Sequence, residues 1–409
     1  MRQTLRRRTM TRTDRISAPW LDWPGTRAVM AALEAARPGG ARFVGGCVRN
    51  PLRGVETDDI DIATQLKPDE TLLALCDAGI RAIPTGIEHG TITAIVDSRP
   101  FEITSLRRDV ETDGRRAVVT FTEDWAEDAE RRDFRLNAIY ASADGRLHEV
   151  VPGSIEDALT GRVIFIGDAD QRLREDFLRI LRFFRFNAWY GAGIDADGLA
   201  ACARQKEGLK KIAAERIWKE LQKLLAAPDP TEAVTAMQDS GVLAIFLPEA
   251  ETLDGLHDLR VSETLAGVQA DPMLRLMALI HRSANSVLAV SKRLRLSNAE
   301  ANRLTMWAAD NLPDVSGMNG RQLRQALYWH GKQAVVDRAL TSGRNVRDLL
   351  FAVRAWKRPE FPVGGDDALA AGLKGPEIGQ ALRKLEEWWM AEDFQPDRDQ
   401  LLERLGKLS

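Results

Sequence analysis

Two acidic residues alternate with two isoleucines in the segment Asp59-Ile60-Asp61-Ile62. Successive side chains of a β-strand point to opposite faces, so a strand here would bury both isoleucines and place both carboxylates on the other face. Two adjacent carboxylates suit Mg²⁺, which proteins usually hold through one or two carboxylates together with substrate phosphates and water. Such a pair more often marks only the wetted face of a strand, so its surroundings decide its meaning.

A pair of glycines lies a short distance upstream. Gly45 and Gly46 follow the apolar residues Phe43-Val44, and Arg49 comes three positions later. Residues without side chains let backbone N–H groups approach a phosphate, and a guanidinium fork matches phosphate oxygens. An ordinary strand-to-helix turn is the alternative, but it would leave the neighbouring carboxylates unexplained. The whole stretch therefore predicts a triphosphate seat beside a metal site, which is the chemistry of nucleotidyl transfer.

The stretch GGCVRNPLRGVETDDIDIAT, residues 45–64, resembles the head-domain signature of the class II tRNA nucleotidyltransferase and poly(A) polymerase family, within the polymerase-beta-like nucleotidyltransferases. Further segments resemble this family in its own order. FEITSLR (101–107) is similar to the strand with a third carboxylate, RRDFRLNA (131–138) to the motif that contacts ribose and triphosphate, and EDFLR (175–179) to the nucleobase-reading motif. ERIW (215–218) resembles a later helix start, and the resemblance covers roughly residues 40–225.

The resemblance implies roles for individual residues. It implies a catalytic set of Asp59, Asp61 and Glu102, with Asp59 and Asp61 as metal ligands for two Mg²⁺ ions and with CTP and ATP as substrates. Nucleotidyl transfer needs mainly positioning and charge neutralisation, which two metal ions commonly supply. Glu102 on its own would be interpreted as a solvated strand residue, so its assignment rests on the resemblance. The expected nucleotide contacts in the matching motifs are Gly45, Gly46, Arg49, Arg132, Asp133, Asn137, Asp176 and Arg179.

Arginines occupy every third position in the segment 174–186, which contains no glycine or proline. On a single helix these residues would form a polar stripe opposite an apolar face. A solvated basic face is the simpler interpretation. The second interpretation is nucleobase selection, because an aspartate accepts from an exocyclic amine and an arginine donates to a carbonyl or ring nitrogen, favouring cytosine or adenine without a nucleic-acid template. The stripe consists of Asp176, Arg179, Arg182 and Arg185.

Two positions depart from the family pattern inside these motifs, and a third segment matches it loosely. Asn50 stands where the family usually has aspartate, and Arg135 replaces the usual threonine. The segment 151–154 is a loose version of the family's linker. None of these departures removes a metal ligand, so we expect activity to be retained.

Patterning predicts an α+β chain with a mixed-sheet α/β head followed by an all-helical neck, body and tail. Strand patterns recur at 91–96 and 101–104, whereas the chain after about residue 155 is helical almost throughout, with amphipathic runs at 214–226, 231–238, 272–283, 299–309, 321–330 and 377–389. The expected boundaries are a disordered tail at 1–20, the nucleotidyltransferase head at 21–154, the nucleobase-recognition neck at 155–226, and a tRNA-binding body and tail at 227–409.

Several segments leave alternatives open. The arginine-rich start could be a transit peptide, an RNA-binding arm, a disordered tail, or a leader upstream of a true start at Met10. The polar stretch 108–128, with Asp113-Gly114 as a turn, is predicted to be a mobile loop, and the resemblance places a loop that reshapes the nucleotide pocket between C and A addition at this point. His257-Asp258 invites comparison with metal-dependent phosphohydrolases, but further ligands are not recognisable, so we expect a surface position. The tryptophans of the C-terminal part are expected to pack in the core.

Composition limits the partners. A net charge of −3 over 409 residues argues against indiscriminate nucleic-acid binding, although basic residues crowd the segment 204–223 and leave tRNA binding open. No apolar run is long enough to span a bilayer. Three scattered cysteines without metal spacing indicate a reducing, cytoplasmic location. No obligate protein partner is evident.

The resemblance implies template-independent, Mg²⁺-dependent addition of CMP, CMP and AMP to the 3′ end of tRNA. The alternatives are a bacterial poly(A) polymerase or an enzyme that adds only CC or only A. The segment 84–107 resembles the tRNA enzymes, and the head lacks a basic GRRFR-like run, both of which argue against the polymerase. A non-catalytic RNA-binding protein is disfavoured because Asp59, Asp61 and Glu102 are all present.

Overall fold

The chain forms two compact units. The computed structural model describes residues 14–112, 117–309, 311–342 and 346–407, without the side chains of 109–112 and 117–119. The first unit comprises Met1–Glu220 and Glu232–Ile245, and the second comprises Leu221–Thr231 and Phe246–Ser409. Two helices that the sequence assigned to the body, α10 (Thr231–Asp239) and α11 (Leu243–Phe246), thus lie almost entirely in the first unit.

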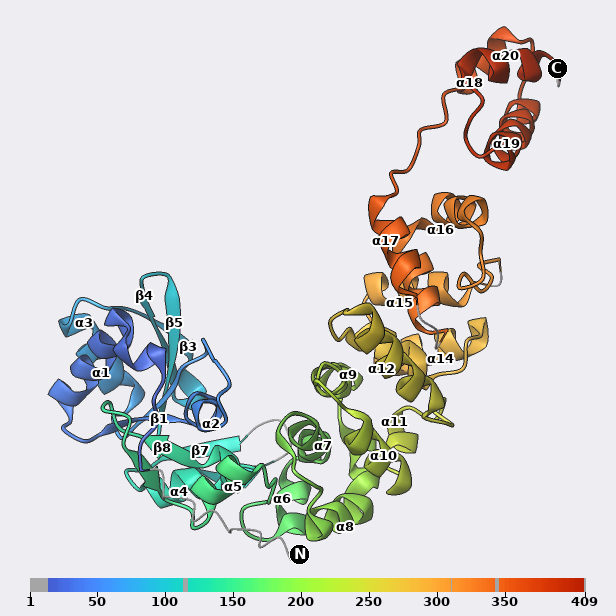
Figure 1. Ribbon diagram of the computed structural model, residues 1–409. Coiled ribbons are helices and arrows are strands. Elements are labelled where there is room, and N and C mark those ends of the chain that lie inside the picture. Colours follow the sequence, from blue (N-terminus) through green and yellow to red (C-terminus); the bar gives the residue numbers. More distant parts are fainter. Residues whose placement is uncertain (1–13, 113–116, 310, 343–345, 408–409) are drawn as a thin grey trace, which may run out of the picture. The chain divides into compact units, whose positions relative to one another are not determined.

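A seven-stranded mixed sheet forms the centre of the head, with strand order β3-β4-β5-β2-β1-β8-β9 (Figure 1). Strand β1 is antiparallel to β2 and β8, whereas β2 is parallel to β5. The predicted mixed-sheet head is therefore confirmed. Its strands are β1 (Ala41–Val44), β2 (Asp61–Thr64), β3 (Arg81–Gly86), β4 (Thr91–Val96), β5 (Arg99–Ser105), β8 (Ile139–Ala141) and β9 (Leu147–Glu149).

The alternation at residues 59–62 has the predicted effect on burial. Ile60 and Ile62 are each 1% exposed, whereas Asp61 is half-buried and Asp59 is exposed. Strand β2 begins at Asp61, two residues later than predicted, so Asp59 lies in the segment that leads into the strand. The two buried isoleucines fix the register that turns Asp61 to the opposite face.

Short helices surround the sheet of the head. Helix α1 begins with a proline at its first position, where the missing N–H costs nothing, and packs against α3 and β1. Its buried face includes Val29, Met30 and Leu33. The helices are η1 (Pro19–Asp22), α1 (Pro24–Ala36), α2 (Gly46–Leu52), α3 (Pro68–Asp77), η2 (Ile87–His89), α4 (Trp125–Glu130), η3 (Arg135–Asn137) and α5 (Ser154–Thr160).

The head begins earlier than residue 21. Ile16 is buried, and its N–H donates to the carbonyl of Gly145 at 2.9 Å. Trp20 is also buried and packs edge-on against Phe43, with 4.7 Å between ring centroids. The expectation of a disordered tail up to residue 20 is therefore wrong for residues 14–20, because two apolar side chains fold onto the sheet. Residues 1–13 lie outside the described residues.

The segment predicted as an unstructured loop contains an antiparallel hairpin. Strand β6 (Arg107–Thr112) pairs with β7 (Ala117–Phe121), and helix α4 follows almost at once. The predicted Asp113-Gly114 turn lies outside the described residues. The prediction of a loop was wrong because the run AVVTF at 117–121 is rich in β-branched and aromatic residues, which favour a strand.

The neck begins with two helices where the sequence predicted one. Helix α6 (Ala169–Glu175) ends at Asp176, which is extended at φ −151° and ψ 106°, and α7 (Leu178–Tyr190) follows. The Asp176 carboxylate accepts the N–H of Leu178 at 3.1 Å. A short acidic side chain that bonds to the nearby backbone competes with helix continuation, which explains the break. The remaining neck helices are α8 (Ala196–Gln205), η4 (Lys206–Lys211) and α9 (Ala214–Leu225).

Aromatic rings join the head to the neck inside the first unit. Phe134, from the head, lies 4.8 Å from Phe165 and 5.3 Å from Phe186 between ring centroids. Phe165 in turn stacks on Phe183 at 5.5 Å. These four buried rings form one continuous core. The motif 131–138 is therefore anchored against α7 by its phenylalanine.

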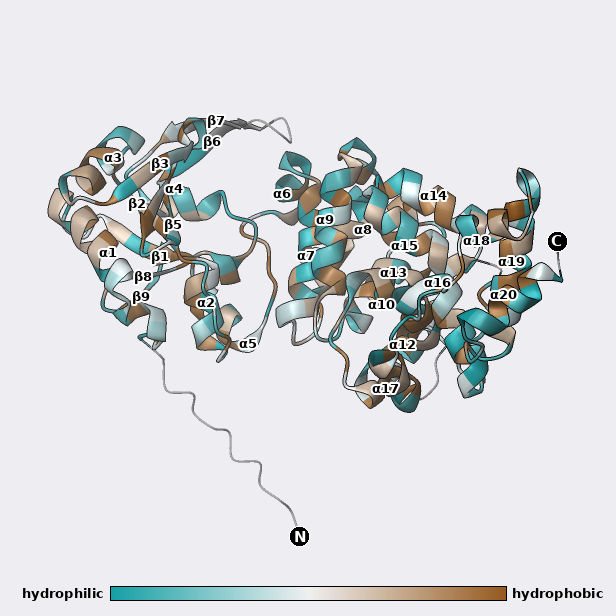
Figure 2. Cartoon of the chain, turned by 90° about the horizontal axis from the view of Figure 1, so that it is seen from above, coloured by the Kyte–Doolittle hydropathy of each residue, from teal (hydrophilic) through white to brown (hydrophobic). Residues whose placement is uncertain are grey.

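The second unit is entirely helical in its described residues. Its helices carry both hydrophilic and hydrophobic residues, as the colours in Figure 2 show. The predicted amphipathic runs correspond to helices here, although α13 ends earlier than predicted and α16 is interrupted at Gly331, with φ 79°. The helices are α12 (Asp254–Ala266), α13 (Pro272–Leu279), α14 (Ala284–Leu294), α15 (Asn298–Ala308), α16 (Gly320–Leu340), α17 (Arg347–Ala355), α18 (Gly365–Ala370), α19 (Pro376–Ala391) and α20 (Arg398–Gly406).

Most of the surface and core predictions for this unit are confirmed. His257 and Asp258 are exposed, as expected for a surface pair. Trp307 and Trp389 are buried in the core, but Trp329 is 47% exposed. Within the described part of the chain, no helix has the length and apolar character to cross a membrane.

Arg275 is a fully buried cation in the second unit. Its Nε and Nη2 donate to the Glu263 carboxylate at 3.1 and 2.9 Å. Its Nη1 donates to the carbonyls of Leu225 and Ala227, and its Nη2 reaches Pro228 at 3.4 Å. One guanidinium therefore neutralises a buried carboxylate and satisfies the last carbonyls of α9 and the turn that follows.

We expect Arg275→Met to lower the unfolding free energy of the second unit by about 3–5 kcal/mol, because Glu263 would remain buried without a partner. Urea denaturation of the full chain measures the loss. Arg275→Met combined with Glu263→Met should recover part of it. Arg293→Met is the matched control, since the Arg293–Glu249 pair is more exposed and should contribute under about 1 kcal/mol. Equal losses in both single variants would contradict this account.

Candidate active site

The turn between β1 and α2 depends on Gly45. This residue adopts φ 73° and ψ −124°, which side chains disfavour. Its N–H donates to the carbonyl of Ile139 at 3.2 Å, so Gly45 shapes the turn and its own N–H is occupied. Gly46 opens α2 directly afterwards. A Cβ atom at position 45 would lie 4.0 Å from Nη1 of Arg132, which places this arginine beside the turn.

The predicted carboxylates meet at the neighbouring strands. Asp61 on β2 pairs in register with Glu102 on the parallel strand β5, so the two residues lie side by side. Burial, followed by the charges of Asp59 and Glu102, raises the pKa of Asp61 to about 6, although Arg132 opposes the shift. The structure therefore brings Asp59, Asp61, Glu102 and Arg132 into one electrostatic cluster.

This cluster has the donor chemistry of a Mg²⁺ site, since its ligands are carboxylate oxygens whose mutual repulsion a cation would relieve. Among the described residues, no three His, Cys, Asp or Glu side chains form a closed metal-ligand set. A site of this kind would leave coordination positions for substrate oxygens, as is usual for Mg²⁺ bound with phosphates.

Arg132 is held by a residue that the sequence analysis did not single out. Asp128 on α4 is completely buried and accepts from Nη2 of Arg132 at 3.0 Å, from Nη2 of Arg131 at 2.6 Å, and from the Tyr140 hydroxyl at 2.9 Å. Burial favours the protonated acid, but the charges of Arg132 and Arg131 outweigh it and lower the pKa of Asp128 to about 2. Asp128 thus stays ionised and fixes the direction of Arg132.

Arg49 is buried and held by three neutral partners. Its guanidinium donates to the side-chain oxygens of Asn50 and Asn137, and to the Tyr190 hydroxyl at 2.8 Å. It also lies 4.0 Å above the Tyr190 ring. Burial lowers the pKa of Arg49. Asn50, which replaces the family's aspartate, therefore still orients Arg49, through an amide oxygen at 2.9 Å in place of a carboxylate.

Asp133 joins the head to helix α7. Its Oδ1 accepts from the Asn137 amide at 2.9 Å, and its Oδ2 accepts from Nε of Arg182 at 2.7 Å. Burial would raise the pKa of Asp133, but the charge of Arg182 and these hydrogen bonds lower it. Asp133 and Asn137 were predicted to contact the nucleotide, and the structure shows them engaged in a network with Arg182 and Arg49.

The predicted base-reading residues also have protein partners. Asp176 accepts from Nη2 of Arg216 at 2.9 Å, and Nη1 of Arg179 donates to Glu175 at 2.6 Å. Nη2 of Arg179 reaches back to the carbonyl of Arg131 in the head at 3.2 Å. All four residues of the two pairs are partly exposed, so a ligand can still approach them.

Arg185, the last residue of the stripe, is paired with Glu220 on α9 at 2.7 Å and lies 4.3 Å above the Phe186 ring. Burial lowers the pKa of Arg185. The charges of Asp176 and Glu220 both raise the pKa of Arg182, so Arg182 lies between the two ends of the stripe. The three arginines therefore form one polar face of α7, as predicted, but with a carboxylate partner for each.

Arg135 has a structural role at the position where it departs from the family pattern. Its Nε donates to the buried carboxylate of Asp157 on α5 at 2.6 Å, and Arg162 lies near the same carboxylate. Its guanidinium also lies near Gly153, where an added Cβ would come within 3.4 Å. Arg135 thus ties the motif 131–138 to the segment that leads into the neck.

Sequence reasoning missed the residues that orient the functional side chains, and only one of them left a local signal. Asp128 precedes Arg131 and Arg132 by three and four positions, the spacing of neighbours on a helix. The other partners lie far away in sequence and had no such signal. They are Tyr140, Asp157, Tyr190, Arg216 and Glu220.

Two family models match the chain, one in the head and one in a range that extends from the first unit into the second. The family described as the poly A polymerase head domain matches residues 41–164. The family described as the probable RNA and SrmB-binding site of polymerase A matches residues 193–253. The first range contains the Gly45 turn, the carboxylates and the motif 131–138.

Individual relatives match most of the chain. The mouse (Mus musculus) CCA tRNA nucleotidyltransferase 1, mitochondrial, is 36% identical over 385 residues, which cover 90% of this chain and 86% of the relative. The CCA-adding enzyme of Limosilactobacillus fermentum is 30% identical over 380 residues, covering 90% and 93%. The crystal structure of the Bacillus stearothermophilus CCA-adding enzyme in complex with CTP has the same fold, with a TM-score of 0.75, 23% identity, and coverage of 94% and 98%.

We expect Asp128→Asn to weaken CTP binding at least about tenfold without changing tRNA affinity, because a charge-assisted hydrogen bond that aims Arg132 contributes about 1.5–3 kcal/mol. The control is Asp157→Asn, which removes another buried carboxylate shared by two arginines but lies outside the Asp61 cluster. Titration with CTP and thermal unfolding separate the effects. If both variants lose stability alike but neither loses CTP affinity, Asp128 has only a structural role.

Proposed function

Because the chain belongs to the family of CCA-adding tRNA nucleotidyltransferases, we propose that it adds CMP, CMP and AMP in turn to the 3′ end of tRNA without a nucleic-acid template. The observation that carries this proposal is the cluster of Asp59, Asp61 and Glu102 beside the Gly45 turn and Arg132. This cluster combines acidic groups with a basic group beside a glycine turn, and transfer between a triphosphate and a hydroxyl needs such positioning and charge neutralisation. CTP, ATP and tRNA are the corresponding substrates.

Asp59 and Asp61 are the residues that would hold magnesium, with Glu102 as the third carboxylate of the catalytic set. When bound, Mg²⁺ lowers the pKa of an attacking hydroxyl and neutralises charge on the triphosphate. The arrangement supports this assignment because Asp61 sits half-buried among like charges, which raises its pKa to about 6. Asp61 binds a cation in preference to a proton only when the neighbouring carboxylates hold that cation as well.

The turn at Gly45 and the side chain of Arg132 act on the triphosphate directly. The absent side chain at Gly45 leaves room beside Nη1 of Arg132, so a phosphate can approach both the turn and the guanidinium. Asp128 keeps that guanidinium in place before substrate arrives, which avoids the entropy cost of ordering it during the reaction. As the new phosphodiester forms, the leaving pyrophosphate takes the bond electrons, and Arg132 stabilises the charge that develops on it.

Selection of the nucleobase falls to Asp176 and Arg179 in this proposal, with Arg182 and Arg185 beside them. An aspartate oxygen accepts from the exocyclic amine of cytosine or adenine, and an arginine donates to the adjacent ring nitrogen or carbonyl. Uracil and guanine present the opposite pattern at those atoms. The partial exposure of Asp176 and Arg179 supports the proposal, because each retains surface for a ligand beyond its protein partner.

A cytoplasmic location remains part of the proposal. The mouse relative carries a mitochondrial designation, so fractionation of the native cells, with a fluorescent fusion as a second measurement, is the deciding experiment. A poly(A) polymerase is the competing activity. Incubating the chain with tRNAs that end before, within and just short of CCA, with single labelled NTPs, separates the two, since CCA addition stops after three nucleotides.

We expect Asp61→Asn and Asp59→Asn each to slow nucleotide addition by about a thousandfold or more, because the loss of a metal ligand removes several kcal/mol of transition-state stabilisation. Affinity for tRNA should stay within about twofold, since it depends mostly on phosphate contacts elsewhere. Glu102→Gln should also be severe. Single-turnover incorporation and a binding assay on the same preparations provide the measurement. Near-normal turnover in Asp61→Asn would remove the metal assignment.

We expect Asp176→Ala to lose discrimination against UTP and GTP by about 1–3 kcal/mol, the usual contribution of one well-placed hydrogen-bonding contact to a base. Asp170→Ala is the matched control, because Asp170 lies on α6 in an exposed pair with Arg204. Competition among all four NTPs, with sequencing of the products, measures selectivity. Unchanged selectivity in Asp176→Ala would return the stripe to the simpler interpretation of a solvated basic face.

A further inference from the structure

The second unit contains a cavity of about 350 Å³ with two arginines in its wall. Arg282 follows α13, and Arg338 lies near the end of α16. Two hydroxyl residues, Thr341 and Ser342, complete the polar side of the wall. Trp307 forms part of the apolar side. Two guanidinium groups and two hydroxyls facing one cavity provide only hydrogen-bond donors or adaptable groups, apart from one carboxylate on Asp314.

Arg282 and Arg338 are among the arginines of this unit that form no ion pair with a described carboxylate. The ion pairs in this unit join Arg260, Arg275, Arg293, Arg303, Arg324 and Arg398 to carboxylates, and neither cavity arginine is among them. Nη1 of Arg282 makes only two long contacts of 3.4 Å, to the carbonyls of Ala308 and Ala309. Both arginines are half-buried. Their positive charges are therefore partly shielded from water, and no carboxylate among the described residues forms an ion pair with either of them.

The electrostatics of Arg338 agree with this geometry. Burial lowers its pKa, the neighbouring charge of Arg282 lowers it further, and Asp314 acts in the opposite direction. The Asp314 carboxylate is itself occupied by the N–H and hydroxyl of Ser316 at 2.9 and 2.7 Å. One carboxylate against two guanidinium groups leaves a net positive cavity.

The wall of the cavity is firmly held. The Trp307 indole N–H donates to the Thr341 hydroxyl at 2.9 Å, and this hydroxyl donates to the carbonyl of Asp337. The Ser342 hydroxyl donates to the carbonyl of Ala339. Because these indole and hydroxyl donors are already used within the wall, the two arginines are the groups that remain for an anion, and the fixed wall limits the ordering cost of binding it.

We propose that this cavity binds a phosphate group through Arg282 and Arg338. Arginine forks match the oxygens of a phosphate, and a dianionic or diester phosphate supplies the counter-charge that the two guanidinium groups lack. The phosphate has two possible sources, a backbone phosphodiester of the tRNA substrate or free inorganic phosphate. The first source rests on the proposed function, whereas the second does not.

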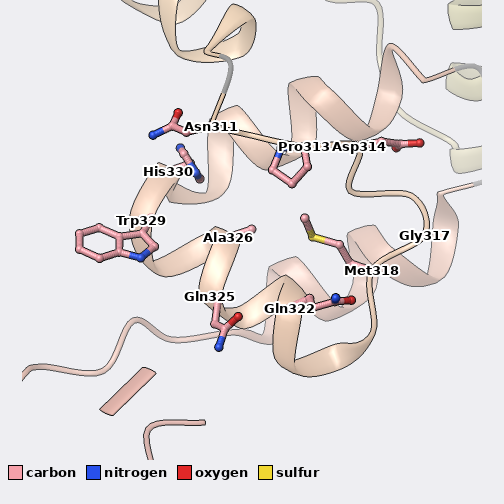
Figure 3. Close-up of a pocket in the computed structure, with 10 residues that line it drawn as sticks. All are labelled: Asn311, Pro313, Asp314, Gly317, Met318, Gln322, Gln325, Ala326, Trp329 and His330. Carbon is pink, nitrogen blue, oxygen red and sulfur yellow. The ribbon is translucent and has the colours of Figure 1, made fainter. Parts of the chain in front are cut away.

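A neighbouring cavity of about 470 Å³ shares Asp314 with the first cavity (Figure 3). This second cavity distinguishes a tRNA phosphodiester from free phosphate. Trp329 lines this cavity and is 47% exposed, and Gln322 and Gln325 provide amide groups. An aromatic face with adjacent amides suits an unstacked nucleobase. A phosphodiester at the arginines would bring an attached nucleoside towards Trp329, whereas free phosphate would leave this cavity untouched.

The experiment uses the full-length chain with Arg338→Gln and Arg282→Gln. Arg321→Gln is the matched control, because Arg321 lies exposed at the start of the same helix α16 and lines neither cavity. For tRNA, the slope of log Kd against log salt concentration should fall by about one in each cavity variant, the loss expected for one phosphate contact. Inorganic phosphate at constant ionic strength should raise the melting temperature of wild type and Arg321→Gln only.

Three further results decide the proposal. Arg338→Lys should recover part of the lost phosphate effect, since it keeps the charge, and this separates binding from misfolding. If Trp329→Ala weakens tRNA binding, the phosphate comes from the tRNA backbone. If phosphate stabilises the chain but the variants leave tRNA binding unchanged, the ligand is free phosphate. If the cavity variants match Arg321→Gln in both measurements, the proposal is overturned. CTP incorporation at saturating tRNA is measured in parallel, so that failure of the proposed function is seen separately.

Discussion

The buried negative charge of Asp133 organises the first unit, because it must be neutralised by groups from two distant parts of the chain. Arg182 supplies the positive charge from α7, and Asn137 supplies a hydrogen bond from the head. Asn137 then accepts from Arg49 beside the glycine turn. The phosphate side and the base side of the proposed site are therefore connected by three consecutive contacts. Breaking one of them would leave a buried charge or amide unsatisfied, which costs more than the contact contributes when intact.

The two departures from the family pattern have different consequences. Arg135 gains a direct ion pair with Asp157 and so becomes part of the framework between head and neck. Arg49 keeps its orientation through Asn50, but its immediate partners are all uncharged. A cation that is positioned by neutral oxygens retains more of its field than one paired with a carboxylate. Replacement of aspartate by asparagine therefore preserves the geometry of Arg49 while leaving its charge available to an anionic ligand.

Local patterns in the sequence predicted the features that depend on neighbours in the chain. The burial of Ile60 and Ile62, the turn at Gly45 and the arginine face of α7 all follow from periodicity or backbone freedom. The residues that orient the site could not be predicted from local patterns. Tyr190 contacts Arg49, and Glu220 contacts Arg185, only after the chain has folded. The break at Asp176 was missed for a related reason, since one side-chain hydrogen bond to the backbone outweighed a run of good helix formers.

The hairpin β6–β7 is attached at both ends to the proposed catalytic cluster. Strand β6 starts two residues after Ser105, the end of the strand that carries Glu102, and β7 leads within a few residues into α4, which carries Asp128. The two ends of the hairpin thus continue into the elements that carry Glu102 and Asp128. A deletion at the start of β6 or at the end of β7 would change the short connection to one of these elements, so the chain length at the two ends of the hairpin is tied to the positions of a carboxylate and of the residue that orients Arg132.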